Sequence, residues 1–183
     1  MVLTESFQVK LGSGAQPFSL KGTDEHTYSL QTFSDVRILV LVFMCNHCPY
    51  IQACIDRLVG LQRDFADRSV RFVGINSNDS TDYPEDNFEA MQAFFTEKKM
   101  NFPYLHDVTQ QVAREYDAVC TPDIFVYDSQ RKLQYHGRID NNWKDASKVS
   151  SHELRDALEA VVGGHVPSSV QYPSMGCSIK WRD

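Results

Sequence analysis

Two almost purely apolar runs stand out in the pattern of hydrophobic and polar positions along the chain. Residues 37–43 (RILVLVF) and 70–76 (VRFVGIN) are rich in branched and aromatic side chains and lack the alternation of a half-exposed strand. Such runs are typical of central strands that are buried on both faces. Each is followed by a segment, 49–67 and then 86–98, in which apolar residues recur every three or four positions. This spacing predicts two amphipathic helices and the order strand, helix, strand, helix.

The middle of the chain contains shorter elements. The pattern predicts an extended piece at 102–105 and a short helix at 110–116. Residues 123–127 (DIFVY) and 133–137 (LQYHG) have the composition of strands, and the polar residues between them have the length of a hairpin turn. These two strands are therefore expected to form an antiparallel pair.

A last helix is predicted near the end of the chain. Apolar residues recur with helical spacing over 150–162, with Ser150 or Ser151 as the expected N-cap. Gly163 then ends the helix. The tail, 164–183, shows no periodicity, and we expect it to be irregular.

The order of these elements predicts the fold class. Strands that alternate with helices indicate a mostly parallel sheet covered on both faces, and the closing hairpin indicates an antiparallel edge. We therefore expect an α/β fold, with a central mixed sheet flanked by helices. A length of 183 residues is natural for one domain. The prediction is a single domain over residues 1–183, with its core at about 12–163.

Composition and charge argue against several classes of partner. The formal net charge is −6 and no run of basic residues is present, so neither nucleic acid nor an anionic membrane is expected as a partner. The longest apolar stretch, 38–44, is far too short to span a membrane. Residues 1–10 contain Glu5 and no apolar segment, so they do not resemble a secretory signal, and a cytoplasmic location is the simplest expectation.

The cysteines indicate thiol chemistry rather than a structural framework. There are five: Cys45, Cys48, Cys54, Cys120 and Cys177. A chain of this length buries enough apolar surface to fold without disulfides. An odd and sparse set points to a reducing compartment in which a few thiols are reactive. Cys54 falls on the apolar face of its predicted helix and is interpreted as a small buried hydrophobic residue.

The motif Cys45-Asn46-His47-Cys48-Pro49 lies between the first buried strand and the first amphipathic helix. Two cysteines at this spacing at the start of a helix lie within disulfide reach, and the helix N-terminus stabilises a thiolate. We expect Cys45, at an exposed lip, to attack, and Cys48, one turn inward, to resolve the mixed disulfide. Pro49 suits the first helical turn because its missing N–H is not needed there.

His47 has two interpretations. A protonated imidazole beside Cys48 would favour the thiolate over the disulfide and raise the reduction potential, and the alternative is a solvated loop histidine. A structural zinc site would need two ligands besides the cysteines, and the sequence has no second CxxC and no His-x-His pair. We therefore expect no metal and no cofactor beyond the redox-active cysteines. The remaining polar candidates are interpreted as solvated loop residues: Asp79, Asp82, Asp86, His106, His136, His152 and His165.

A second motif, Cys120-Thr121-Pro122-Asp123, comes immediately before a predicted strand. A proline at a turn that enters a strand is a common place for a cis peptide bond, which makes Pro122 a candidate. A cis-proline opposite the cysteine pair would expose the Thr121 backbone, which can then pair with an extended substrate strand. Cys120 is either a buried core residue or an accessory thiol. Cys177, in the aperiodic tail, is either an extra resolving thiol or an idle surface residue.

The two motifs together resemble the thioredoxin superfamily over about residues 12–163. The opening segment is similar to the redoxin branch, which includes the alkyl hydroperoxide reductase/thiol-specific antioxidant peroxiredoxins and the TlpA- and ResA-like reductants. The strings FMCNHCPY, CTPD and GCSIKW are similar to a peroxiredoxin-like subgroup of redoxins. The resemblance implies a thioredoxin-like fold with an N-terminal redoxin extension, a cis-Pro122, and a redox role for Cys45 and Cys48.

Three functions follow from these observations. The first is a thiol–disulfide oxidoreductase acting on protein or small-molecule thiols and disulfides, with an unidentified electron donor or acceptor. The second is a peroxiredoxin-like antioxidant thiol peroxidase that uses Cys48, with Arg138 as a candidate peroxide contact. The peroxiredoxin motif Pro-x-x-x-Thr/Ser-x-x-Cys is broken, because Leu41 takes the place of its proline and Cys45 that of its hydroxyl residue. The third is a non-catalytic thioredoxin-fold binding module.

Overall fold

The computed structural model describes residues 3–182. Within them, the main sheet has seven strands in the order β3-β2-β6-β5-β4-β8-β9. These strands are β2 (Ser19–Gly22), β3 (Thr27–Ser29), β4 (Ile38–Phe43), β5 (Val70–Asn76), β6 (Tyr104–His106), β8 (Asp123–Tyr127) and β9 (Leu133–Gly137). A three-stranded sheet, in the order β1-β10-β7, consists of β1 (Leu3–Glu5), β7 (Cys120–Thr121) and β10 (Met175–Ser178).

Helices connect the strands close to the predicted positions. The α-helices are α1 (Pro49–Phe65), α2 (Phe88–Glu97), α3 (Gln111–Glu115) and α4 (Glu153–Val162), and the short 3₁₀ helices are η1 (Leu30–Phe33), η2 (Ala66–Arg68), η3 (Pro84–Asp86) and η4 (Ala146–Lys148). α4 begins later than predicted, and its N-cap is His152, so the expected N-cap at Ser150 or Ser151 is wrong. The N–H groups of Ser150 and Ser151 donate instead to the side-chain oxygen of Asn141. No helix within residues 3–182 is long and apolar enough to cross a membrane.

β4 lies inside the main sheet, between β5 and β8. It pairs in parallel with β5 and antiparallel with β8, so that Val42 lies opposite Gly74 on one side and Ile124 on the other. β5 pairs in parallel with β6, and β8 pairs antiparallel with β9. At the other edge, β2 pairs antiparallel with both β6 and β3. This arrangement confirms the predicted α/β fold with a central mixed sheet, but the expectation of a mostly parallel sheet is wrong, because within residues 3–182 only β4, β5 and β6 pair in parallel.

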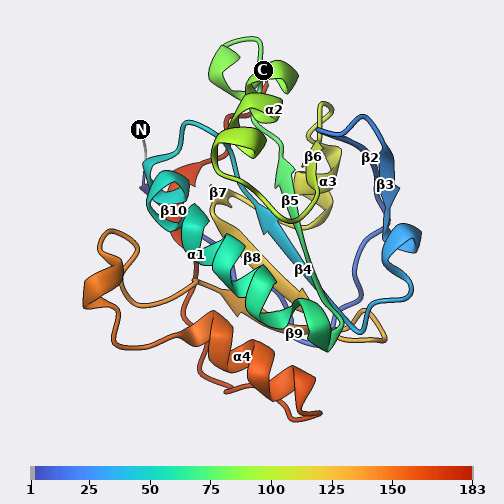
Figure 1. Cartoon of the computed structure of the whole chain (residues 1–183), viewed down its shortest axis with the longest axis vertical. Helices are drawn as coiled ribbons and strands as arrows, with labels where there is room; N and C mark the ends of the chain where they lie inside the picture. The colour runs from blue at the N-terminus through green and yellow to red at the C-terminus, as the bar shows by residue number, and fades with distance from the viewer. Residues whose placement is uncertain (1–2, 183) are drawn as a thin grey trace.

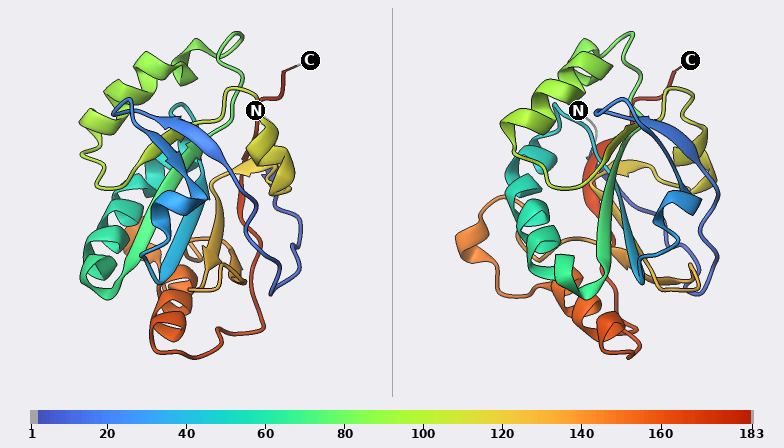
Figure 2. Two further views of the ribbon diagram at one scale, coloured as in Figure 1. Left: turned by 90° about the vertical axis from the view of Figure 1, so that its right-hand side faces the viewer. Right: turned by 45° about the vertical axis from the view of Figure 1, so that its right-hand side comes forward.

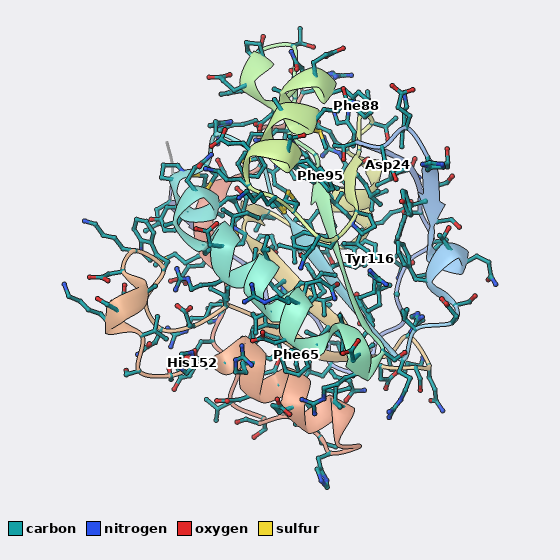
Figure 3. All side chains as sticks on the ribbon, in the orientation of Figure 1. Asp24, Phe65, Phe88, Phe95, Tyr116 and His152 are labelled. Atoms are coloured by element: carbon teal, nitrogen blue, oxygen red, sulfur yellow. The ribbon has the colours of Figure 1, made fainter. Side chains whose placement is uncertain are left out.

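Helices cover both faces of this sheet. Val40 and Val42 of β4 pack into a core cluster with α1 and α4, while Leu41 and Phe43 pack into a second cluster with α3. Figures 1 and 2 show the corresponding layers, with α1 and α4 on one face and α3 on the other. Phe65, the last residue of α1, lies on the side of the sheet that α1 and α4 cover, and Tyr116 lies on the α3 side (Figure 3). Because successive side chains of β4 point to opposite faces of the sheet, they contribute to two separate hydrophobic cores.

The end of the chain differs from the prediction of an irregular tail. β10 lies between β1 and β7, with Cys177 opposite Leu3 on one side and Thr121 on the other. The hydrophobic pattern does not predict β10, because a strand of four residues contains too few alternating positions. In Figure 1, β10 lies beside β7 near the start of α1. The tail thus returns to the region of the CxxC motif.

Candidate active site

The two CxxC cysteines lie on the loop that joins β4 to α1. β4 ends at Phe43, and α1 begins at Pro49, in the first turn, where no N–H is required. Cys48 is the N-cap residue of α1 and has an extended backbone conformation. Its sulfur is therefore close to the helix end that carries partial positive charge.

Both cysteines are buried. Cys45 is 1% exposed and Cys48 is 0% exposed, so the expectation that Cys45 lies at an exposed lip is wrong. The sulfur of Cys45 lies 3.4 Å from the hydroxyl of Thr121 and within 4.8 Å of a carboxylate oxygen of Asp86. Thr121 and Asp86, which are distant in sequence, thus help to bury the two cysteines, and a local sequence pattern cannot predict this burial.

The Thr121–Pro122 peptide bond is cis, as predicted, and Thr121 contacts both cysteines. Its main-chain oxygen lies 3.2 Å from the sulfur of Cys48. The predicted exposure of the Thr121 backbone is wrong, because Thr121 is 2% exposed and pairs with Cys177 of β10. The edge expected to receive a substrate strand is occupied by the chain itself.

Hydrogen bonds place the negative charge of the reduced pair on Cys48. The hydrogen bond from Cys45 is the main cause that lowers the pKa of Cys48 to about 5, against its burial. The Thr121 hydroxyl, the Cys177 thiol and the N–H of Ile51 lower this pKa further. The main-chain oxygen of Thr121 accepts a hydrogen bond from the protonated Cys48 thiol and so disfavours its thiolate. The several donors that face the Cys48 sulfur outweigh this one acceptor.

Cys45 retains the proton of the pair. Its hydrogen bond to Cys48, its burial and the negative charge of Asp86 together raise its pKa well above the ordinary range. Because the thiolate is the reactive form of a cysteine, this distribution is opposite to the expectation that Cys45 attacks first. The sequence does not show that the Asp86 carboxylate lies beside Cys45.

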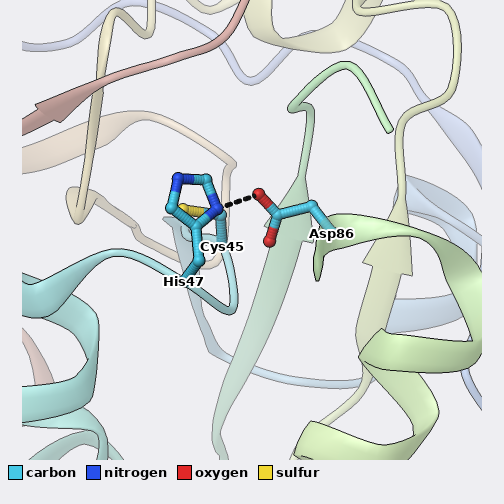
Figure 4. Close-up of side chains that lie close together, drawn as sticks. All are labelled: Cys45, His47 and Asp86. Atoms are coloured by element: carbon cyan, nitrogen blue, oxygen red, sulfur yellow. Dashed lines mark hydrogen bonds and ion pairs between the residues drawn. The ribbon is translucent and has the colours of Figure 1, made fainter. Parts of the chain in front are cut away.

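His47 and Asp86 form an ion pair next to the cysteines (Figure 4). Nδ1 of His47 lies 2.7 Å from Oδ2 of Asp86. The hydrogen bond to Asp86 raises the pKa of His47, against its partial burial. Burial by itself would raise the pKa of Asp86, but hydrogen bonds from His47, Asn78 and the Asn46 N–H lower it. Asp86 is 0% exposed, so its interpretation as a solvated residue is wrong.

Asn46 ties the CxxC loop to two other parts of the chain. Its N–H donates to Asp86 at 2.7 Å, and its side chain donates to the main-chain oxygen of Glu85 at 2.8 Å. Its side-chain oxygen accepts from the hydroxyl of Tyr104 at 2.9 Å. The sequence pattern does not indicate Asp86 or Tyr104 as residues of the site. The available signal is that Asp86 follows β5, whose carboxyl end shares an edge of the parallel sheet with that of β4.

Cys45, His47 and Asp86 also form a group that could hold a metal ion. One ligand atom of each lies within 4.8 Å of the others. Figure 4 shows the three side chains close together. Thiolate, imidazole and carboxylate are ligand types that zinc accepts, but a structural zinc site takes four ligands. An ion here would also replace the hydrogen bond between His47 and Asp86. The sequence does not reveal this group because Asp86 comes from a distant turn.

The other candidate residues lie outside the cysteine pair. Burial raises the pKa of Cys54 to about 12 and that of Cys120 further, so both are unreactive core thiols. Arg138 donates to a carboxylate oxygen of Glu153 and lies 4.5 Å from the ring centroid of Tyr172. Within residues 3–182, Arg138 makes no hydrogen bond to either cysteine. The contact proposed for a peroxide is therefore engaged in another interaction.

The side chains interpreted as solvated divide into an exposed set, Asp82, His152 and His165, and a buried set, Asp79, Asp86, His106 and His136. Nε2 of His136 lies 2.8 Å from Oδ1 of Asp123, and both side chains are buried. Asp79 forms an ion pair of 3.0 Å with Arg182. The buried set is therefore a correction, and tertiary partners explain it.

Comparison with known proteins gives a family and a fold. Residues 11–136 match the AhpC/TSA family. A hypothetical protein from Sinorhizobium meliloti 1021 is 37% identical, with 98% of each chain covered and a TM-score of 0.94. An uncharacterized conserved protein from Geobacillus kaustophilus is 39% identical, with 100% of this chain and 97% of that chain covered and a TM-score of 0.94.

A more distant structure identifies the fold. The thioredoxin domain of a thiol-disulfide oxidoreductase from Bacteroides vulgatus is 18% identical, with 69% of this chain and 86% of that chain covered and a TM-score of 0.59. This likeness shows a thioredoxin-like fold, as the sequence motifs imply. A search of curated proteins found no match.

Proposed function

Because this chain belongs to the AhpC/TSA family, we propose that it is a thiol–disulfide oxidoreductase that cycles Cys45 and Cys48 between dithiol and disulfide. The observation that carries the proposal is the hydrogen bond between these two thiols at the start of α1, where the pKa of Cys48 is lowered to about 5. Thiol redox chemistry is typical of the family. The substrates are expected to be protein or small-molecule thiols and disulfides.

The charge distribution suggests the order of the steps. The Cys48 thiolate attacks one sulfur of a substrate disulfide, forming a mixed disulfide and releasing the other substrate sulfur as a thiolate, which takes a proton. Cys45 then loses its proton and attacks the sulfur of Cys48. The Cys45–Cys48 disulfide forms, the second substrate thiol leaves, and two electrons have passed from the pair to the substrate.

Trapping of the mixed disulfide tests this order. We expect Cys45→Ser, combined with Cys177→Ser to remove a neighbouring thiol, to accumulate a mixed disulfide with a disulfide-bonded peptide. Cys48→Ser in the same background should not accumulate it. Accumulation in Cys48→Ser alone would assign the first attack to Cys45. If the wild-type protein forms no Cys45–Cys48 disulfide in glutathione buffers, the dithiol function fails.

The reduction potential of the pair indicates the direction of electron flow. A value near about −270 mV is typical of a reductant such as thioredoxin, and a value near about −180 mV is typical of an oxidant or isomerase. In one of its two interpretations His47 raises the potential through its positive charge, and Asp86 at 2.7 Å balances that charge. The lowered pKa of Cys48 stabilises the reduced pair and so raises the potential, and we therefore expect a value nearer the oxidant or isomerase. A single domain over residues 1–183 and a cytoplasmic location remain expectations.

A thiol peroxidase is the second candidate, because the lowered pKa of Cys48 suits a cysteine that attacks peroxide. The Cys48 thiolate would take one oxygen to become a sulfenic acid, releasing an alcohol or water, and Cys45 would condense with it to a disulfide and water. Hydrogen peroxide consumption by the wild-type protein, with a dimedone adduct on Cys48 in Cys45→Ser combined with Cys177→Ser, would support this function. Absence of both would exclude it. Stoichiometric zinc bound to Cys45 would instead favour a non-catalytic scaffold.

A further inference from the structure

β10 occupies the position in which a substrate strand would pair with the cis-proline loop. It runs antiparallel to β7, with Cys177 opposite Thr121 and Ser178 opposite Cys120. The N–H of Ile179 continues this contact by donating to the main-chain oxygen of Val119 at 2.9 Å. Backbone pairing of this kind is how extended peptides are recognised at a free strand edge. The chain therefore presents its own strand to its own site.

The close approach of β10 depends on a glycine. A Cβ atom at Gly176 would lie 1.9 Å from the main-chain oxygen of Thr121 and 3.3 Å from the nitrogen of Pro122. Any larger residue would push β10 away from the cis-proline loop. On the preceding side, the hydroxyl of Ser174 donates to the main-chain oxygen of Gly137 at 2.8 Å and anchors the strand. β10 is thus seated firmly beside the cysteine pair.

This seating brings a third thiol to the pair. Cys177 is 2% exposed and belongs to the same core cluster as Cys45 and Cys48. Its thiol donates a hydrogen bond to the sulfur of Cys48. Cys48 therefore has a neighbouring thiol on each side, one from its own loop and one from the end of the chain.

We propose that Cys177 is a third redox-active cysteine, which exchanges with Cys45 for the disulfide to Cys48. This inference rests on the proposed function, because it needs the Cys45–Cys48 disulfide as its starting point. In the exchange, Cys177 loses its proton and its sulfur attacks the sulfur of Cys48. The Cys48–Cys177 bond forms, the Cys45–Cys48 bond breaks, and Cys45 leaves as a thiolate that takes the proton. No net oxidation occurs, so no further oxidant is needed.

The exchange replaces the disulfide within the CxxC motif by one that links Cys48 to β10, and it returns Cys45 to the thiol form. β10 carries its cysteine to the place that the cysteine of an external substrate strand would take. An external strand can use the Thr121 edge only when β10 leaves it.

The test is to map the disulfides of Cys45→Ser after oxidation by diamide, which takes the two electrons of the dithiol. Non-reducing peptide mass spectrometry should show an intramolecular Cys48–Cys177 link in most molecules. Cys120→Ser, added as a matched control on the neighbouring strand, should leave the link unchanged, and Cys177→Ser should abolish it. In the wild-type protein, partial oxidation in glutathione buffer should show both the Cys45–Cys48 and the Cys48–Cys177 links.

The outcomes separate this inference from the proposed function. If wild-type protein forms only the Cys45–Cys48 disulfide and Cys177 stays alkylatable in Cys45→Ser, the inference is overturned and the proposed function stands. If the wild-type protein forms no Cys45–Cys48 disulfide, the proposed function fails. Far-ultraviolet circular dichroism checks that Cys45→Ser folds, and the wild-type measurement does not depend on that variant.

Discussion

Asp86→Asn removes the carboxylate charge beside the cysteine pair while keeping the shape of the side chain. Asp86 accepts hydrogen bonds from His47, from the Asn46 N–H and from Asn78, each at 2.7 Å. A hydrogen bond between charged groups contributes about 1.5–3 kcal/mol to stability. Because His47 is partly buried, we expect the loss of its pair with Asp86 to reduce the free energy of unfolding by about 2 kcal/mol.

The loss should depend on pH in a defined direction. The folded pKa of His47 is raised, so the stabilisation it supplies is complete below its unfolded pKa of about 6.5 and declines as the pH rises through the folded value. The folded pKa of Asp86 is lowered, so its contribution is complete above an unfolded pKa of about 3.9 and declines as the pH falls through the folded value. The effect of Asp86→Asn should therefore be largest between about pH 4 and pH 6.5.

Urea unfolding of the reduced wild-type and Asp86→Asn proteins, at about pH 5.5 and about pH 9, measures this difference. Asp79→Asn is a matched control, because Asp79 pairs with Arg182, which stays charged at both values. The control should show the same loss at both pH values. An Asp86→Asn loss that is equal at both, or larger at the higher pH, would refute the assignment of an ion pair between His47 and Asp86.

Three further predictions concern the thiolate, the core and β10. The absorbance of the thiolate at about 240 nm should rise around pH 5 in the wild-type protein. In Cys45→Ser this rise should occur at higher pH, because Cys45 is the main hydrogen-bond donor to Cys48. A rise at an unchanged pH would contradict that role of Cys45. Phe65→Ala should lower the free energy of unfolding by about 3–5 kcal/mol in urea, since the ring is fully buried, and a loss below about 1 kcal/mol would place it outside the core. Gly176→Ala should accelerate amide hydrogen exchange in β10, because its Cβ would lie 1.9 Å from the Thr121 oxygen, and unchanged protection would show that β10 is not seated as described.

The sequence predicts the central elements well because their signals are local. Six consecutive buried residues in β4 appear as an uninterrupted apolar run, and the apolar face of α1 appears as helical spacing. The elements that it does not predict are short and lie at the edges. β1 has three residues and β10 has four, and backbone pairing of β10 with both β1 and β7, rather than a side-chain pattern, places them.

The candidate site shows the same division. Spacing alone places two cysteines at a helix start. The Thr-Pro motif makes Pro122 a candidate for a cis bond, and the resemblance to the thioredoxin superfamily implies the cis bond that the structure contains. The exposure of Cys45, the freedom of the Thr121 backbone and the solvation of Asp86 are predicted wrongly. Each of these depends on what another part of the chain places against the residue.

By itself, the sequence determined the α/β order of elements and the position of the CxxC motif at the start of α1, because both follow from contacts between residues close along the chain. Only the tertiary structure decided which cysteine holds the charge and which thiol lies beside it. Asp86 arrives from the loop after β5 and Cys177 from the end of the chain, 129 positions after Cys48 (177 − 48). Burial and hydrogen bonding set the pKa of a thiol, and both are properties of the folded surroundings rather than of the local segment.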